Sequence, residues 1–182
     1  MKKTILKFGI PSGFITSALM LIAIPLENRI GYNHSLYLGY TLIVLSFLLV
    51  FFGIRSYRES AGGHITFVRA FTVGISITLI TCAFYVITWE ILYFTVMHDF
   101  MDNYSAHVLE KARAAGAAPA ALQARAEELR KLKEKYENVF YNSALTFMEP
   151  FPVGLLITLL SAAVLRRKPR VETAAAPLTA SS

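Results

Sequence analysis

Residues 36–54 read LYLGYTLIVLSFLLVFFGI, nineteen consecutive residues without a charged side chain. A helix rises about 1.5 Å per residue, so about 20 apolar residues cross the roughly 30 Å hydrocarbon core of a bilayer. The stretch does not alternate apolar and polar residues, as a barrel strand would. It therefore predicts a transmembrane helix.

Three further stretches have the same character. Residues 8–26 carry no charge, residues 70–97 carry only Glu90, and residues 139–165 carry only Glu149. Together with residues 36–54 they make up about half of the chain. We predict an all-α, polytopic membrane protein with four transmembrane helices.

The first of these stretches has an alternative interpretation as a cleaved signal peptide, because basic residues precede it. However, Pro11 and Gly13 interrupt its apolar run, and no small-x-small cleavage site follows it. Loss of this segment would leave the orientation of the other three helices unchanged.

The composition supports a membrane protein. The chain is 55% hydrophobic and 16% charged, with a mean hydropathy of +0.50, whereas about a quarter of the residues of a soluble domain are charged. One small core cannot bury this excess, which excludes an ordinary soluble enzyme. The sequence has no P-loop, dinucleotide fingerprint, CxxC or zincin motif, and His98 with Asp102 offers at most two metal ligands. We predict no enzymatic activity, no cofactor and no metal site.

Basic residues predict the orientation, since Lys and Arg concentrate on the cytoplasmic side. Ten lie at the N-terminus, between the second and third spans, or in the C-terminal tail: Lys2, Lys3, Lys7, Arg55, Arg58, Arg69, Arg166, Arg167, Lys168 and Arg170. The first loop, residues 27–35, has only Arg29. We expect a protein of the cytoplasmic (inner) membrane with both termini cytoplasmic and a disordered tail at 169–182. The net charge of +6 then reflects topology beside anionic lipid and predicts no nucleic-acid partner.

Residues 99–138, between the third and fourth spans, are rich in helix-forming residues. Gly116 and Pro119 interrupt them with a stop and a start signal. We expect an extracytoplasmic helical hairpin that continues the third and fourth helices outward by about 30 Å. A disordered, Ala-rich linker is the alternative. Apolar residues at a spacing of three and four form a seam for a partner helix on the second arm: Leu122, Ala126, Leu129, Leu132 and Tyr136.

Glu90 and Glu149 are the candidate functional acids, because an ionised carboxylate in hydrocarbon is costly. Counting from the hairpin turn places them at similar depth, about one helical turn apart. Two carboxylates that close would hold a cation or share a proton. The structural alternative is that each one bonds to a hydroxyl, or that Glu149 serves the backbone freed by Pro150 and Pro152.

Small residues recur at a spacing of four in three spans and allow helix backbones to approach closely. The glycines in these stripes are Gly9, Gly13, Gly74 and Gly154. Packing within the bundle is the favoured interpretation, and dimerisation is the alternative.

Two segments carry a resemblance to a known family. They are Gly63-His64-Ile65-Thr66-Phe67 leading into Ala70-Phe71-x-x-Gly74, and Glu149-Pro150-Phe151-Pro152-Val153-Gly154-Leu155-Leu156-Ile157-x-Leu159-Leu160-Ser161, closed by Arg166-Arg167-Lys168. Through these two segments the chain resembles bacterial membrane proteins of the domain of unknown function 4199 family. The resemblance covers roughly residues 5–168. The resemblance implies a four-helix inner-membrane protein with an extended segment between helices three and four. It implies no activity and no catalytic residue.

For function, we expect a non-enzymatic interaction or structural protein. Its hairpin would engage a second copy or another membrane protein through the seam at Leu122, Leu129 and Leu132. The alternative is a small ion- or proton-linked transporter or channel component that uses Glu90 and Glu149.

Overall fold

The computed structural model of the chain describes residues 1–30 and 32–167, without the side chains of residues 24–36. The predicted tail therefore lies outside the described residues. Every element in the described part is a helix apart from one isolated bridge, which confirms the all-α prediction. The helices are α1 (Lys2–Ile30), α2 (Tyr32–Ser60), α3 (Phe67–Thr95), α4 (Phe100–Ala114), α5 (Pro119–Tyr136), α6 (Val139–Phe147) and α7 (Pro150–Leu165).

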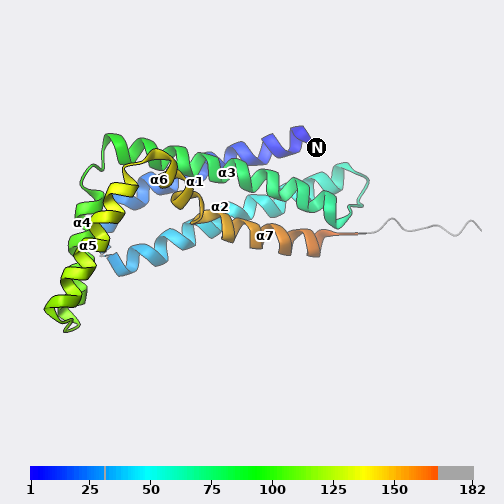
Figure 1. The fold of residues 1–182 in the computed structure, drawn as a ribbon. Helices are drawn as coiled ribbons and strands as arrows, with labels where there is room; N and C mark the ends of the chain where they lie inside the picture. Colours follow the sequence, from blue (N-terminus) through cyan, green and yellow to red (C-terminus); the bar gives the residue numbers. More distant parts are fainter. Residues whose placement is uncertain (31, 168–182) are drawn as a thin grey trace, which may run out of the picture.

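Four segments in the described part are long and apolar enough to cross a membrane, as predicted. They are Lys2–Ala23, Tyr37–Ser60, Phe67–Thr95 and Val139–Leu165. In Figure 1, α1, α2, α3 and α7 run lengthwise as a bundle. The fourth segment consists of two helices, because α6 ends at Phe147 and α7 begins at Pro150. Proline has no N–H group and so cannot donate the backbone hydrogen bond that a continuous helix needs.

Helix α3 lies at the centre of the bundle and packs against α1, α2, α6 and α7. Glycines allow this close packing. A Cβ added at Gly13 would lie 2.4 Å from the Phe84 ring, and one added at Gly154 would lie 2.6 Å from Thr78 Cγ2. Gly9 and Gly74 likewise face side chains of other helices. All four glycines of the predicted stripes therefore contact helices of the same chain.

Buried hydroxyls join the helices beside these glycines. The Thr81 hydroxyl of α3 donates to Ser12 Oγ of α1 at 2.8 Å, and the Ser12 hydroxyl donates to the carbonyl of Ser46 in α2 at 3.0 Å. The hydroxyls of Thr78 and Thr158 lie 2.9 Å apart and link α3 to α7. Hydroxyl bonds of this kind hold helices together in lipid, where apolar contact alone gives no preference for protein over lipid.

The end of the bundle that carries the N-terminus is closed by a tight turn. Gly62 and Gly63 have φ values of +79° and +83°, a region that residues with a Cβ rarely adopt. Thr66 then caps α3 by accepting a hydrogen bond from the Arg69 N–H. Two backbone hydrogen bonds between Ile65 and Arg167 tie this turn to the end of α7.

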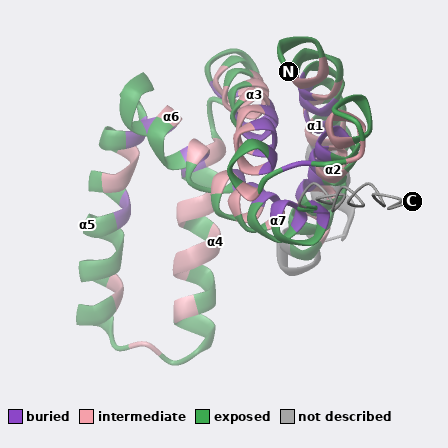
Figure 2. Ribbon diagram, turned by 90° about the vertical axis from the view of Figure 1, so that its right-hand side faces the viewer, coloured by how far each residue is buried: buried purple, intermediate pink, exposed green. Residues whose placement is uncertain are grey.

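At the opposite end, α4 and α5 form an antiparallel pair, here called the α4–α5 pair. Gly116, with φ +80°, lies in its turn, and Pro119 begins α5, as the sequence indicates. The pair runs across the end of the bundle (Figure 1) and extends past its side (Figure 2). It therefore differs in direction from the straight outward continuation that we expected.

Breaks at both joints explain this direction. Helix α3 ends at Thr95, and Asn138 starts a new helix, α6, by accepting hydrogen bonds from the Phe140 and Tyr141 N–H groups. Aromatic side chains then hold the base of the pair against α3. The Phe100 ring lies 4.9 Å from the Trp89 ring, and Tyr136 lies 5.2 Å from Tyr93.

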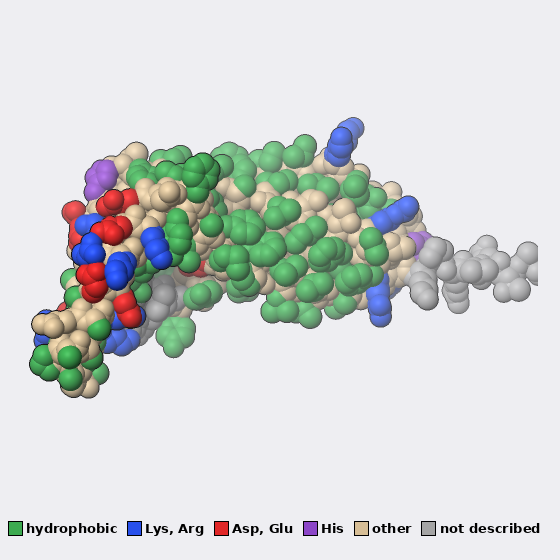
Figure 3. Space-filling view, viewed as in Figure 1, with side chains coloured by type: hydrophobic (Ala, Val, Ile, Leu, Met, Phe, Trp, Pro, Cys, Tyr) green, Lys and Arg blue, Asp and Glu red, His purple; other side chains and the backbone are tan. Residues whose placement is uncertain are grey.

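The surface reflects the same organisation. In Figure 3, hydrophobic side chains cover the middle of the visible face, Lys and Arg lie at the N-terminal end, and side chains of both signs cover α4 and α5. An apolar belt between two charged ends matches a bilayer with water on both sides.

We predict that Gly154→Ala lowers the free energy of unfolding by about 1–3 kcal/mol, because the added methyl group would overlap Thr78 and Phe47. Gly39→Ala is the matched control. A Cβ there meets nothing within 4 Å, so the change should be less than about 1 kcal/mol and favourable, as for Gly to Ala in a helix. Unfolding in mixed detergent micelles measures both. Equal stability of the two variants would contradict this packing.

Candidate functional site

A cavity of about 530 Å³ lies between α1, α2, α3 and α6, at the end of the bundle near the α4–α5 pair. This volume is within the range of small-molecule sites. Phe100 of α4 and Tyr136 of α5 also line it, so the base of the α4–α5 pair forms part of its wall. Most of the other lining side chains are apolar, and they include Leu19, Met20 and Ile43.

One side of the cavity is a polar contact between α3 and α6. Asn142 is fully buried, and its Oδ1 accepts hydrogen bonds from Trp89 Nε1 and from the Thr146 hydroxyl, both at 3.1 Å. Asn142 Nδ2 is buried without a hydrogen-bond partner. This contact fixes the Trp89 ring on the cavity wall.

Glu149 lies on the same wall and accepts a hydrogen bond from the Tyr85 hydroxyl, at 2.8 Å from Oε2. It occupies the N-cap position of α7, but its side chain makes no capping bond. The carboxylate therefore does not serve the backbone freed by Pro150, and it points to α3 instead. Among the described residues that line the cavity, Glu149 is the one with a charged side chain.

Glu90 has a different environment. Its Oε1 accepts a hydrogen bond from the Ser143 hydroxyl at 2.9 Å, and its Oε2 is buried without a partner. Glu90 is not among the described residues that line the cavity. Its carboxylate belongs to the interface between α3 and α6.

The register of these two helices shows why the acids are separate. Glu149 is bonded to Tyr85, and Ser143 is bonded to Glu90. Glu149 is therefore level with Tyr85, which lies five residues before Glu90 on α3. Five residues are about 7.5 Å along a helix, a little more than one turn, which matches the expected depth. However, such positions point about 140° apart around the helix. The contacts in the described structure thus give each acid its own hydroxyl rather than a shared site.

The predicted seam of α5 is used within the α4–α5 pair. Leu129 is 4% exposed, and Leu132 packs on a cluster formed by Tyr93, Met101 and Tyr136. Lys133 of α5 also bonds to Asp102 of α4 at 2.6 Å, which raises the pKa of the Lys133 ammonium. Leu122 is half-buried. The seam therefore stabilises the pair and leaves little apolar surface for another chain.

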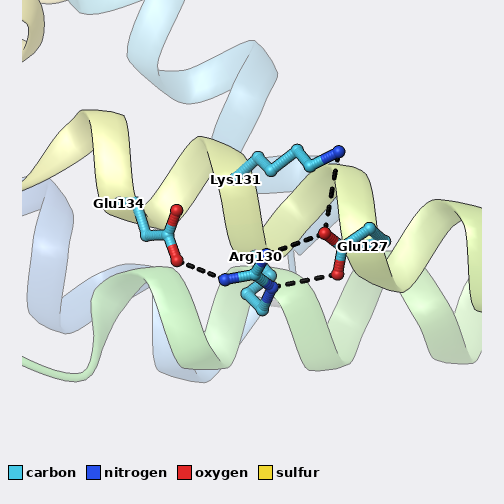
Figure 4. A network of polar contacts seen from close by, with 4 residues as sticks. All are labelled: Glu127, Arg130, Lys131 and Glu134. Atoms are coloured by element: carbon cyan, nitrogen blue, oxygen red, sulfur yellow. Dashed lines mark hydrogen bonds and ion pairs between the residues drawn. The ribbon is translucent and has the colours of Figure 1, made fainter.

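The outward face of α5 carries a charge network (Figure 4). Arg130 binds both carboxylate oxygens of Glu127, at 2.9 and 2.7 Å, and also contacts Glu134, while Lys131 lies 3.6 Å from Glu127. The hydrogen bonds from Arg130 lower the pKa of Glu127 to about 2. All four side chains are about half exposed or more. The charges neutralise one another, as expected of a solvated surface.

The residues of the site that sequence reasoning missed are Tyr85, Trp89 and Asn142. A signal was present in the spacing. Tyr85 and Trp89 are four apart on α3, and Asn142, Thr146 and Glu149 share one face of the fourth span. No group of three or more His, Cys, Asp or Glu side chains placed to hold a metal ion was found in the described part of the chain.

A family described as "Protein of unknown function (DUF4199)" matches residues 7–167. No curated protein and no solved structure matches the chain.

We predict that the Glu127 carboxyl titrates with a midpoint near pH 2, because Arg130 stabilises its ionised form. The ion pair should be intact above about pH 4.5 and be lost as the pH falls towards 2. Carbon NMR of labelled glutamate carboxyls in micelles measures the midpoint. Arg130→Gln should return it towards 4.5, and Lys131→Gln should move it less. A wild-type midpoint near 4.5 would show that the network does not form.

Proposed function

The chain belongs to the DUF4199 family, and we propose that this member is a non-enzymatic membrane protein that binds a small amphipathic molecule in the cavity. The observation that carries the proposal is the cavity itself. It combines an apolar wall with the few placed polar groups, Tyr85 and Glu149 above all, that are typical of ligand sites.

Access supports the same function. Tyr40 on α2 is 51% exposed, and Met148 on the opposite wall is 59% exposed. These residues border the cavity between α2 and α6, so it opens sideways, towards the lipid that surrounds the apolar belt. A ligand with an apolar body would reach the site from the bilayer rather than from water.

The polar groups of the site are held in place by one another. The Tyr85 hydroxyl is bonded to Glu149, and the Trp89 N–H is bonded to Asn142. These two bonds fix α3 side chains against α6 and the start of α7, so the wall offers a ligand a few polar groups in set positions.

We further propose that the protein resides in the cytoplasmic membrane with both termini in the cytoplasm. The basic side chains of the N-terminus, of the α2–α3 turn and of the end of α7 gather at one end of the bundle, and the balanced charges of α4 and α5 lie at the other (Figure 3). This distribution supports a cytoplasmic location for the first end.

We predict that Gly39→Leu blocks the cavity. Gly39 lines it, and a Cβ there meets nothing within 4 Å, so a leucine has room to fill the space without strain. Diphenylhexatriene is a suitable apolar probe, because it accepts energy from tryptophan and Trp89 is the sole tryptophan. The affinity for diphenylhexatriene in dodecyl maltoside micelles should fall at least about tenfold in the variant, because the leucine side chain occupies the space of the probe.

Val164→Leu is the control for the added apolar surface. Val164 is 73% exposed on the outside of α7, so the control should leave binding unchanged. Energy transfer from Trp89 that is equal in the wild type and in Gly39→Leu would reject the cavity as a binding site.

A second candidate function is contact with another copy of the chain through the α4–α5 pair. The observation that favours it is the extension of the pair past the side of the bundle (Figure 2). Because Leu129 and Leu132 are used internally, the contact would involve the Ala-rich tip near Ala118 rather than the seam.

We predict for this second function that Ala118→Cys, in a Cys82→Ala background, forms a disulfide-linked dimer in membranes. Ala118 is exposed at the tip, and Ser60 is exposed at the opposite end of the bundle. Ser60→Cys in the same background is therefore the matched control and should remain monomeric. Electrophoresis without reductant measures both. A monomeric Ala118→Cys protein would exclude self-association through the tip.

A further inference from the structure

We propose that the cavity binds a lipophilic organic cation, an ammonium-bearing amphiphile in particular. This inference rests on the proposed function and adds the chemical class of the ligand. Three features of the wall carry it: its charge, its hydrogen-bonding capacity and its aromatic side chains.

The charge of the wall favours a cation. Glu149 is the one side chain among the described lining residues that can carry a charge, and it is an acid. Its Tyr85 partner is a neutral hydroxyl, and no described lining residue is a basic group that could neutralise it. Glu149 is exposed on the open side of the cavity, where lipid rather than water surrounds the bundle, so its carboxylate attracts a positive charge strongly when it is ionised. An anionic ligand would be repelled.

The hydrogen-bonding capacity of the wall favours a ligand that donates. Five of its polar side chains already donate to an acceptor within the chain: Thr16, Ser46, Tyr85, Trp89 and Thr146. Each hydroxyl keeps acceptor lone pairs after donating its single hydrogen, and the Glu149 carboxylate only accepts when it is ionised. Tyr40 and Tyr136 supply the remaining phenols. The wall therefore offers mainly acceptors, which suit ammonium N–H groups or the polarised methyl groups of a quaternary ammonium.

Aromatic side chains favour an organic cation over an inorganic ion. Five of them line the cavity: Tyr40, Tyr85, Trp89, Phe100 and Tyr136. Aromatic faces attract ammonium groups and are used for this purpose in cages for quaternary ammonium ligands. A calcium or magnesium ion would instead need about six oxygen ligands, and the described lining residues include a single carboxylate. The apolar residues, such as Leu19 and Met20, would contact the body of an amphiphile.

The test compares two fluorescent probes that share a body and differ in charge. Trimethylammonium-diphenylhexatriene carries a quaternary ammonium group, and diphenylhexatriene is neutral. Both report binding near Trp89 by energy transfer, in the intact protein in dodecyl maltoside micelles. Glu149→Gln removes the charge but keeps an acceptor for the Tyr85 hydroxyl. Glu90→Gln is the matched control, since it removes a membrane acid outside the cavity.

We expect the wild type and Glu90→Gln to bind the cationic probe more tightly than the neutral one. Glu149→Gln should lose about tenfold or more in affinity for the cationic probe, since an ion pair in a poorly screened site is lost. Its affinity for the neutral probe should change by less than about twofold, which shows that the fold is intact.

Other outcomes overturn specific parts of the proposal. If Gly39→Leu blocks both probes but Glu149→Gln leaves the preference unchanged, the cavity binds ligands and the cation class is wrong. If Gly39→Leu affects neither probe, the proposed function itself fails. If Glu90→Gln loses the preference as Glu149→Gln does, the assignment to Glu149 is wrong.

The ammonium group could belong to a bilayer lipid or to a free amphiphile, and competition separates these sources. Displacement of the cationic probe by phosphatidylethanolamine, but not by phosphatidylglycerol, assigns the site to a lipid headgroup. Displacement by tetraphenylphosphonium alone assigns it to a free lipophilic cation. Displacement by none of the three contradicts a site for organic cations.

Discussion

Gly13, Gly74 and Gly154 bring helix backbones so close that a Cβ at any of them would lie within 3 Å of a side chain on another helix. The rest of the structure depends on this close approach around α3. Helices that already lie in lipid gain no further hydrophobic free energy when they associate. Dense packing and hydrogen bonds between hydroxyls must therefore hold them together. The Ser12–Thr81 and Thr78–Thr158 contacts, beside two of these glycines, supply such bonds.

The same packing cannot continue to the end of the bundle near the α4–α5 pair. Helix α7 packs against both α2 and α3, but the break before Pro150 separates it from α6, which packs against α3. The space where α2 faces α6 is therefore left unfilled, and it is the cavity. A single proline break thus accounts both for the bent fourth span and for the position of the candidate site.

The sequence predicted the helices and their order because these depend on local properties. An uncharged apolar run in lipid must satisfy its backbone hydrogen bonds internally, and a helix does so. Gly116 and Pro119 mark a turn between two helices. Two features could not be predicted from a local stretch of sequence, because they depend on how the helices are rotated relative to one another. One is the direction of the α4–α5 pair, set by aromatic contacts such as Trp89–Phe100. The other is the burial of Leu129, which lies on the second helix of that pair.

The two membrane acids show why rotation matters for function as well as for fold. Glu90 and Glu149 lie at the expected relative depth, and each accepts one hydrogen bond from a hydroxyl. Their chemistry is the same, but Glu90 faces a helix interface and Glu149 faces open space lined by aromatic rings. A carboxylate at an interface can only stabilise packing. A carboxyl group on a cavity wall has no basic partner among the described lining residues, and the negative charge that it carries when ionised is what a cationic ligand would recognise.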